Sequence, residues 1–307
     1  MPAPHRVRVI VNAEGGTVRA GGVSAMDLAD AFARHGIEAE MRFVPGELVA
    51  AEAQAALADA TAGSVDAVVV GGGDGTVGTV AGVLADSGVL LGVLPLGTLN
   101  HFAKDLGLPQ DVESAVQVIA NGRSRAVDVA EVNGRVFINN SSIGIYPYMV
   151  VDRDRRRHED GNSKWPAMTL AFARMFWRFP RRRLRLHAEG WSTPHRTPCL
   201  FIGNNVYSMQ LMTLGQRDRL DSGRLWLFLA KQRTRVGLLW FALRATVGSI
   251  DQMRDFEELN SPTLEIDMHA SRVHVATDGE VTTMRPPLHY RSRPQALRVF
   301  ATPVAVA

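Results

Sequence analysis

Residues 68–79, VVVGGGDGTVGT, decide the fold of this chain, because three valines run directly into a glycine-rich loop. An uninterrupted apolar run is typical of a strand that a parallel sheet buries on both faces. Glycines let backbone N–H groups approach a ligand closely, and a helix that begins after them points the positive end of its dipole at the same place. The stretch therefore predicts a phosphate-binding loop between a buried strand and a helix.

Two familiar phosphate-binding motifs do not fit this loop. Gly73, Gly75 and Gly78 satisfy G-x-G-x-x-G, but the next strand, which ends in VLPLGTLN, has no carboxylate for a ribose. A Walker A loop needs a lysine after its last glycine, and none is present. Asp74 places a carboxylate among the loop amides, which favours a Mg²⁺ ion beside phosphate or a role in handling a proton. The structural alternative is an aspartate that caps the following helix.

A second loop of similar composition follows the next predicted strand, in LPLGTLNHFAKDLGLP (94–109). Gly97 and Thr98 repeat the pairing of a glycine with a hydroxyl, and Asn100 adds an amide able to reach a nucleotide. Open α/β sheets bind their ligands at the carboxyl ends of neighbouring strands. The two loops together therefore predict a nucleotide site.

The first 125 residues alternate between strand and helix patterns. Strands are predicted at 6–12, 38–44, 65–70 and 90–97, and helices at 24–36, 45–63, 77–88 and 111–122. This alternation predicts a parallel sheet with helices on both faces.

From residue 126 the pattern changes to short β-rich segments separated by turn residues. The first of them, RAVDVAEVNGRVFINNSSIGI, has alternating strands around an Asn-Gly turn at 133–134. Only 164–179 and 235–256 have a helical pattern. We therefore expect an α/β domain over 1–125 and a mostly antiparallel domain over 126–290. The tail, 291–307, is expected to return to the first domain.

Composition limits the class of protein. A chain with 46% hydrophobic and 21% charged residues is typical of a globular protein and not of a disordered one. Its one cysteine, Cys199, excludes an intrachain disulfide and suits a reducing compartment. The N-terminal apolar stretch is too short for a secretory signal, and no stretch approaches the roughly 18 apolar residues that span a bilayer. We expect a cytoplasmic protein.

The order of VNAEGG (11–16), GGDGT (72–76) and PLGTLNHFA (95–103) resembles the diacylglycerol kinase catalytic-domain family, which includes sphingosine and ceramide kinases and bacterial lipid kinases. The likeness continues through FINNSSIGI (137–145), DSG (221–223) and DGE (278–280). It implies an N-terminal parallel-sheet domain of the NAD kinase and phosphofructokinase type and a C-terminal β-sandwich domain. It also implies ATP and Mg²⁺ in the cleft between them, and transfer of the γ-phosphate to a lipid hydroxyl.

The resemblance also implies roles for individual residues. The nucleotide site would contain Asn12, Gly72, Gly73, Asp74, Gly75, Thr76, Gly97, Thr98 and Asn100. Glu280 would accept the proton of the lipid hydroxyl, with Asp278 and Asp74 as further catalytic carboxylates, because an alcohol is a poor nucleophile until it loses its proton. On an extended strand, residues 278 and 280 project to one side and would face one cleft. The alternative for DGE is an ordinary Asp-Gly hairpin turn.

The chain also departs from the family pattern. His101 follows Asn100 where an aspartate is common, Gly78 stands where an asparagine often follows GGDGT, and FVPGEL (43–48) lacks a threonine that often contacts nucleotide. These differences bear on the adenosine contacts. For the family's structural Mg²⁺ site, RDRLDSG supplies Asp218 and Asp221 but has Ser222 after them.

The leading hypothesis is an ATP-dependent lipid kinase in the cytoplasm that works transiently at the inner face of the membrane. Two arginine-rich segments, 152–157 and 181–185, would meet the headgroups, although a solvated basic face beside a docked helix explains them as well. A kinase of a soluble alcohol or of NAD, and a nucleotide-binding regulatory protein, are the alternatives. No specific nucleic acid partner is expected, and a homodimer is compatible with the sequence.

Overall fold

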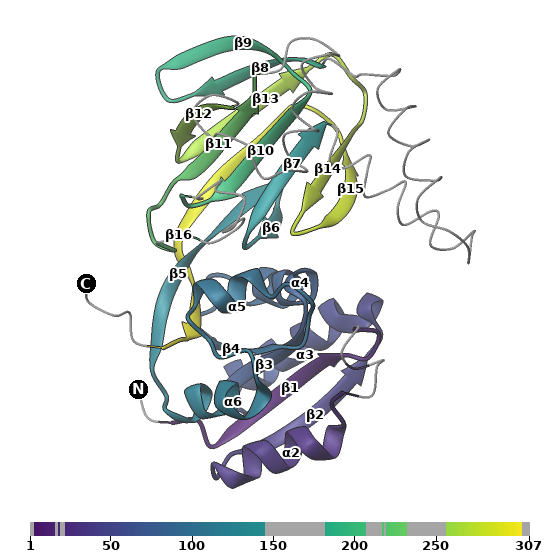
Figure 1. Ribbon diagram of the computed structural model, residues 1–307, viewed down its shortest axis with the longest axis vertical. Coiled ribbons are helices and arrows are strands. Elements are labelled where there is room, and N and C mark those ends of the chain that lie inside the picture. The colour runs from purple at the N-terminus through teal and green to yellow at the C-terminus, as the bar shows by residue number, and fades with distance from the viewer. Residues whose placement is uncertain are drawn as a thin grey trace, which may run out of the picture.

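The computed structural model describes residues 3–15, 18, 22–144, 182–206, 217, 219–231 and 256–302. The basic segment 152–157, the expected helix at 164–179 and Asp218 lie outside these residues, and so does the expected helix at 235–256 apart from its last residue. The described residues form two parts joined by two long strands, β5 and β16 (Figure 1).

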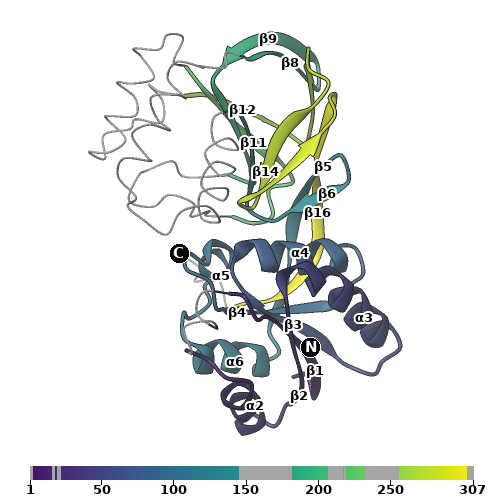
Figure 2. The ribbon, with the colours of Figure 1, turned by 90° about the vertical axis from the view of Figure 1, so that its right-hand side faces the viewer.

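The first part confirms the predicted parallel sheet, with strands in the order β2-β1-β3-β4. The strands are β1 (Arg6–Asn12), β2 (Glu38–Val44), β3 (Ala67–Gly72) and β4 (Leu90–Pro95). The helices are α2 (Ala25–Arg34), η1 (Gly46–Leu48), α3 (Val49–Thr61), α4 (Asp74–Leu84), α5 (His101–Asp105) and α6 (Val112–Ala120). One core cluster joins α3 and α4 to one face of the sheet, and another joins α2 and α6 to the opposite face (Figure 2). Both faces are therefore covered, which is why every residue of β3 and β4 is buried.

Local side-chain caps mark the starts of two helices, α2 and α6. Ser24 and Asp27 form a capping box at the start of α2, and the Asp111 side chain accepts the Ser114 N–H at the start of α6. Helix α4 begins at Asp74, three residues earlier than predicted, and α5 was not predicted at all.

The second part packs two β layers against each other. Its strands are β5 (Ser124–Val132), β6 (Arg135–Phe137), β7 (Asn140–Gly144), β8 (Arg182–Ala188), β9 (Trp191–Thr197), β10 (Cys199–Asn204), β11 (Leu225–Ala230), β12 (Phe256–Ser261), β13 (Thr263–Met268), β14 (Val273–Thr277), β15 (Glu280–Met284) and β16 (Leu288–Phe300). In the described part, one layer has the order β12-β11-β10-β7-β14-β15 with antiparallel neighbours. An apolar cluster from β7, β10, β11 and β14 on one side and β5, β8, β13 and β16 on the other fills the space between the layers.

Strand β8 occupies part of the arginine-rich segment 181–185 and was not predicted. Leu184 and Leu186 point into the core, whereas Arg183 and Arg185 are exposed. The period of two along the strand separates the two kinds of side chain. The described end of the segment is therefore one strand with a basic outer face.

Strand β16 connects the two parts within a single sheet. Near its start it pairs antiparallel with β13, and near its end Arg298 and Val299 pair parallel with β4. It also pairs antiparallel with β5, with a shift of register between Arg293 and Leu297. Domain boundaries at 125 and 290 stay a prediction, because β5 and β16 belong to both parts of the sheet.

Candidate active site

The two predicted loops touch at the carboxyl ends of β3 and β4. Gly72 pairs with Pro95 in the parallel ladder, so Gly73 and Gly97 follow neighbouring strand ends. A Cβ atom built on Gly97 would lie 2.4 Å from Cα of Gly73 and 3.0 Å from its nitrogen. Backbone cannot yield as a flexible side chain can, so this contact requires glycine at position 97.

The end of β1 joins the same edge of the sheet through Asn12. Its Nδ2 donates to Oγ1 of Thr76 (3.1 Å), and its Oδ1 accepts the N–H of Glu14 (2.9 Å). Thr98 is exposed at the tip of the second loop. The carboxyl ends of three adjacent strands therefore converge, as in other open α/β sheets that bind ligands.

The Asn100 amide is used within its own loop. Its Oδ1 accepts the N–H of Gly97 (2.9 Å), and its Nδ2 donates to the carbonyls of Pro95 (3.1 Å) and Gly97 (3.0 Å). Asn100 has a left-handed backbone with φ of 51°, which asparagine tolerates better than most residues. Asn100 thus shapes the loop, and a direct contact with nucleotide stays a prediction.

Asp74 is the first residue of α4, and its side chain caps a different helix. The carboxylate accepts the backbone N–H groups of His101 (3.1 Å) and Phe102 (3.0 Å), the first two residues of α5. Asn139, at the start of the second part, donates its Nδ2 to Oδ1 of Asp74 (3.1 Å). Asp74 therefore links the first loop, α5 and the second part at one carboxylate.

The DGE motif forms a hairpin turn between β14 and β15. Thr277 pairs with Glu280, and Asp278 and Gly279 have φ values of 48° and 87°. The expectation that 278 and 280 share one face of an extended strand is therefore wrong, and the Asp-Gly turn is the correct local reading. The turn nevertheless brings both carboxylates to the first loop.

Backbone N–H groups hold the Asp278 carboxylate. Ile138 and Asn139 each donate to it at 2.8 Å, and Asn140 donates at 3.1 Å. Burial, with a smaller contribution from the nearby charge of Asp74, raises the pKa of Asp278 from 3.8 to about 6 against the lowering effect of these three donors. Two interacting carboxylates thus meet beside the loop.

Glu280 lies against the start of α4. Its Oε2 accepts from Nη2 of Arg135 (2.7 Å), a residue of the neighbouring β5–β6 hairpin. A Cβ atom built on Gly75 would lie 3.0 Å from Oε1 of Glu280, and one built on Gly78 would lie 2.7 Å from Oδ2 of Asp278. Glycines on this face of α4 therefore allow the turn to approach the helix.

A cavity of about 230 Å³ runs along this contact. One wall is α4, and the others come from the β5–β6 hairpin and the β14–β15 turn. Its lining residues are Gly75, Gly78, Thr79, Gly82, Val83, Gly134, Arg135, Val136, Thr277, Asp278 and Glu280.

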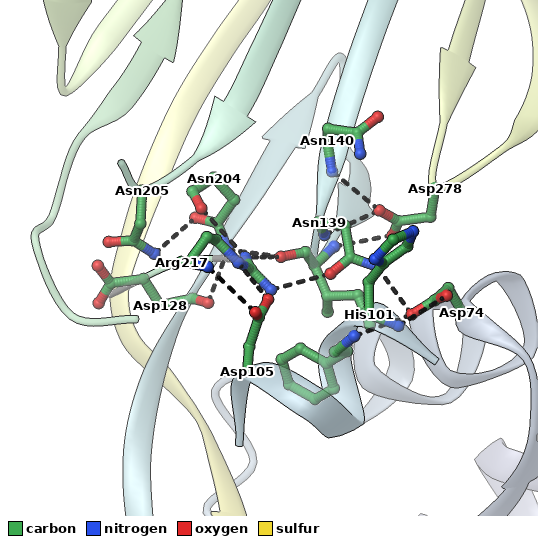
Figure 3. A network of polar contacts seen from close by, with 12 residues as sticks. Asp74, His101, Asp105, Asp128, Asn139, Asn140, Asn204, Asn205, Arg217 and Asp278 are labelled. Atoms are coloured by element: carbon green, nitrogen blue, oxygen red, sulfur yellow. Dashed lines mark hydrogen bonds and ion pairs between the residues drawn. The ribbon is translucent and has the colours of Figure 1, made fainter. Parts of the chain in front are cut away.

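A buried polar network, which the sequence analysis did not foresee, continues from Asp74 away from this cavity (Figure 3). Asn139 bonds to Asp74 on one side and accepts from Nη2 of Arg217 (2.9 Å) on the other. Nε of Arg217 donates to Oδ2 of Asp105, the last residue of α5, at 2.7 Å. The FINNSS motif contains Asn139 but gives no sign of this role, and no local pattern singles out Arg217.

The predicted structural Mg²⁺ site stays a prediction. Asp221 is about half exposed and pairs with Nε of Arg219 (3.0 Å), and Asp218 lies outside the described residues. Within the residues that the structure describes, no group of three or more His, Cys, Asp or Glu side chains is arranged to hold a metal ion.

Comparison with known proteins gives a family match for the first part of the chain. The model of the family described as "Diacylglycerol kinase catalytic domain" matches residues 6–132. A protein of Klebsiella pneumoniae (strain 342) named "Probable lipid kinase YegS-like" is 45% identical over 84 residues. A protein of Yersinia pestis (strain Pestoides F) with the same name is 44% identical over 85 residues. These stretches cover 26% of this chain and only 28% and 29% of the two relatives.

Solved structures match over the whole length. A diacylglycerol kinase from Bacillus anthracis str. Sterne superposes with a TM-score of 0.68 at 19% identity, covering 99% of both chains. Yeast NADH kinase in complex with NADH gives a TM-score of 0.51 at 12% identity, covering 99% of this chain and 85% of the enzyme. Similarity at these identities establishes the shared fold, including the second part, and confirms the expected fold class.

Proposed function

We propose, from the match of residues 6–132 to the model of the diacylglycerol kinase catalytic-domain family, that the chain is a lipid kinase that transfers the γ-phosphate of ATP to a lipid hydroxyl. One observation carries the proposal: the Glu280 carboxylate, from a turn in the second part, lies against the start of α4, directly after the glycine loop. A phosphate bound at that helix start and an alcohol beside Glu280 would be neighbours.

The nucleotide side of the site is the edge where β1, β3 and β4 end. The loop amides around Gly73 and the first turn of α4 point a positive field at that edge, which suits a polyphosphate. Asn12, Thr76, Gly97 and Thr98 lie on the same edge, and we assign the triphosphate to it.

Glu280 is the proposed proton acceptor. Arg135 holds Oε2, so that Oε1 remains directed at the loop. A carboxylate within hydrogen-bond reach of an alcohol removes its proton as the bond to phosphorus forms, which contributes roughly a hundredfold or more to the rate. Such a base has to lie beside the phosphate site, and the position of Glu280 against the start of α4 supports this assignment.

Asp74 and Asp278 fit a Mg²⁺ ion that arrives with ATP. Mg²⁺ is usually held by one or two carboxylates together with phosphate oxygens and water, so a site without three protein carboxylates is typical. Both carboxylates accept three N–H groups, which leaves acceptor capacity for a cation. The bound ion would neutralise charge on the phosphates.

The polar end of the lipid would lie in the cavity beside Glu280. Its volume of about 230 Å³ is below the roughly 300–1,000 Å³ of pockets that enclose a drug-sized ligand, so only the polar end would enter and the tails would remain outside. The described residues contain no helix that is both long and apolar enough to cross a bilayer. We propose a cytoplasmic enzyme that meets the inner face of the membrane through segments 152–157 and 181–185, and the exposed Arg183 and Arg185 of β8 support the second contact.

The proposal is tested by incubating the protein with γ-³²P-ATP, Mg²⁺ and a total lipid extract, followed by chromatography of the labelled lipid. A labelled lipid is expected, and its identity names the acceptor. Asp74→Ala and Glu280→Ala are the control variants. Glu280→Ala should bind ATP as the wild type does but label at least about a hundredfold less lipid.

Full labelling by both variants would exclude this mechanism. Labelling of a soluble alcohol or of NAD without any lipid would favour the first alternative. Binding of ATP with no transfer to any acceptor would favour a nucleotide-binding regulatory protein.

A further inference from the structure

We propose that Arg217 is a positioning residue for the candidate active site: its buried guanidinium fixes the orientation of the Asn139 amide, which then holds Asp74. The inference rests on the proposed function for its kinetic consequence, but its geometry stands on contacts between described residues (Figure 3).

Arg217 is surrounded by oxygen acceptors. Its Nε and backbone N–H donate to the two oxygens of Asp105 at 2.7 and 3.1 Å. Nη1 donates to the carbonyls of Ile138 (2.6 Å) and Asn204 (3.1 Å), and Nη2 donates to Oδ1 of Asn139 (2.9 Å). The side chains of Arg217 and Asp105 are 0% and 1% exposed, so water cannot substitute for these contacts.

The two neighbours of Asn139 determine which way its amide points. A guanidinium can only donate hydrogen bonds, so the atom of Asn139 that faces Arg217 must be Oδ1. A carboxylate can only accept them, so the atom that faces Asp74 must be Nδ2. A flipped amide would place two donors together at Arg217 and two acceptors together at Asp74. The network therefore permits one orientation.

The same residues fix the position of α5. Asp74 accepts the N–H groups at the start of this helix, and Asp105 at its end is paired with Arg217. The guanidinium carbon also lies 6.0 Å from the centre of the Phe102 ring. Arg217 thus connects the second glycine loop, whose helix is α5, to the segment 138–140 that donates to Asp278.

Lysine cannot replace this arginine. An ammonium group carries the charge but lacks the planar set of donors that reaches four acceptors in different directions. In the Arg217→Lys variant, the new ammonium group should still pair with Asp105 but should no longer donate to Asn139. Arg219→Lys is the matched control, because Arg219 lies two residues away, is 69% exposed and contacts Asp221.

The first readout does not depend on catalysis. The side-chain NH₂ of Asn139, assigned in a ¹⁵N correlation spectrum by its absence in Asn139→Ala, should exchange with water at least about tenfold more slowly than that of the exposed Asn260. Asn260 also accepts from an arginine, Arg224, at 2.9 Å, which makes it a matched reference. Arg217→Lys should remove the slow exchange, and Arg219→Lys should preserve it.

The second readout is kinetic. Arg217→Lys should lower kcat about 10- to 100-fold, because a misplaced Asp74 disturbs the reacting arrangement. If Arg217→Lys does not fold, Asn139→Ala decides, since it cuts the connection and leaves the Arg217–Asp105 pair intact. Asn139→Ala should show the same fall in kcat, with Asn260→Ala unchanged.

The inference is overturned by fast exchange of the Asn139 amide in the wild type. It is equally overturned by an Arg217→Lys protein whose amide exchange is unchanged, or by full kcat in Asn139→Ala. A wild type without kinase activity but with a slowly exchanging Asn139 amide would contradict the proposed function and leave the positioning role standing.

Discussion

Asp74 and Asp278 lie in two regions that build a carboxylate site in opposite ways. Asp74 follows a strand and opens a helix within one short loop, so its place is set by neighbouring sequence. Asp278 lies in a two-residue turn and depends on the backbone of residues 138–140. The comparison teaches that half of the site is local and half requires contacts between distant segments.

The two regions also differ in what holds the charge. Asp74 accepts N–H groups from the start of α5 and from Asn139, which belong to different parts of the molecule. Asp278 accepts hydrogen bonds from three backbone N–H groups of one segment, residues 138–140, which leads into β7. A substitution that displaces Asn139 in the second part should therefore also displace Asp74. A substitution in the glycine loop should leave the N–H groups that donate to Asp278 in place.

The largest effect is expected from adding one methyl group where the two glycine loops touch. Gly97→Ala would put a Cβ atom 2.4 Å from Cα of Gly73, and neither backbone can move aside cheaply. Separation of the loops should lower kcat/KM for ATP about 100-fold. Steady-state kinetics measures the loss.

The matched control is Gly46→Ala. A Cβ atom there would lie 3.5 Å from Nδ2 of Asn12, which is an ordinary contact, and the residue is at the same edge of the sheet. Its kcat/KM should stay within about threefold of wild type. Equal losses in the two variants would show that the contact between the loops is not what matters.

A smaller effect is expected in the pH dependence of the free energy of unfolding, which tests the burial of Asp278. Because Asp278 keeps its proton up to about pH 6 when folded, against 3.8 for its ordinary pKa, the folded state binds more protons between these values. The free energy of unfolding should therefore fall as pH rises from about 4 through about 6, and level off above. The pKa difference corresponds to about 2 kcal/mol after allowance for partial exposure, or about 30-fold in the unfolding constant.

Chemical unfolding of wild type and Asp278→Asn at several pH values measures this slope. The asparagine variant lacks the titrating group, so the wild type should lose stability relative to it as pH rises across the window. Parallel curves would mean that Asp278 titrates near its ordinary value and that the second region does not desolvate it.

The smallest expected effect concerns the outer face of β8. Exchanging Arg185 for alanine should lower activity on anionic vesicles about fivefold, because each basic residue near such a surface contributes about 1 kcal/mol. Activity on detergent-dispersed lipid should not change. Arg123→Ala, an exposed position in the first part, is the control. An equal fall on both substrates would count against membrane contact through β8.

Sequence alone predicts the local half of this molecule well. The run VVV before glycine requires a buried strand, and the capping residues Ser24 and Asp111 mark helix starts that the structure confirms. The hairpin at Asn133 and Gly134 follows from residues that tolerate positive φ, here 47° and 82°. In each case the cause lies within a few residues of the effect.

The rest is set by partners that are far away in the chain. Helix α5 is too short for a periodic signal and depends on Asp74 to cap it. The DGE segment reads equally as strand or turn until β14 and β15 pair. The role of Arg217 depends on acceptors from Asp105, Ile138 and Asn204. The sequence around it, RDRLDSG, does not predict these contacts.

The glycine spacing on α4 is the one overlooked signal that the sequence contained. Gly75, Gly78 and Gly82 recur at helical spacing, and in the structure all three line the cavity. Small residues on one helix face indicate a close approach by another segment, and the β14–β15 turn and the β5–β6 hairpin make that approach.

The unbroken course of β16 has a mechanical consequence. Since β5 and β16 cross between the parts as a hydrogen-bonded pair, a change in the angle between the parts has to bend a two-stranded ladder. Bending is easiest where the ladder is interrupted, between Arg293 and Leu297, and Asp128 clamps that place by accepting the N–H of Gln295 at 2.9 Å. Any change in the spacing between the glycine loops and the DGE turn therefore has to deform this hydrogen-bonded pair of strands.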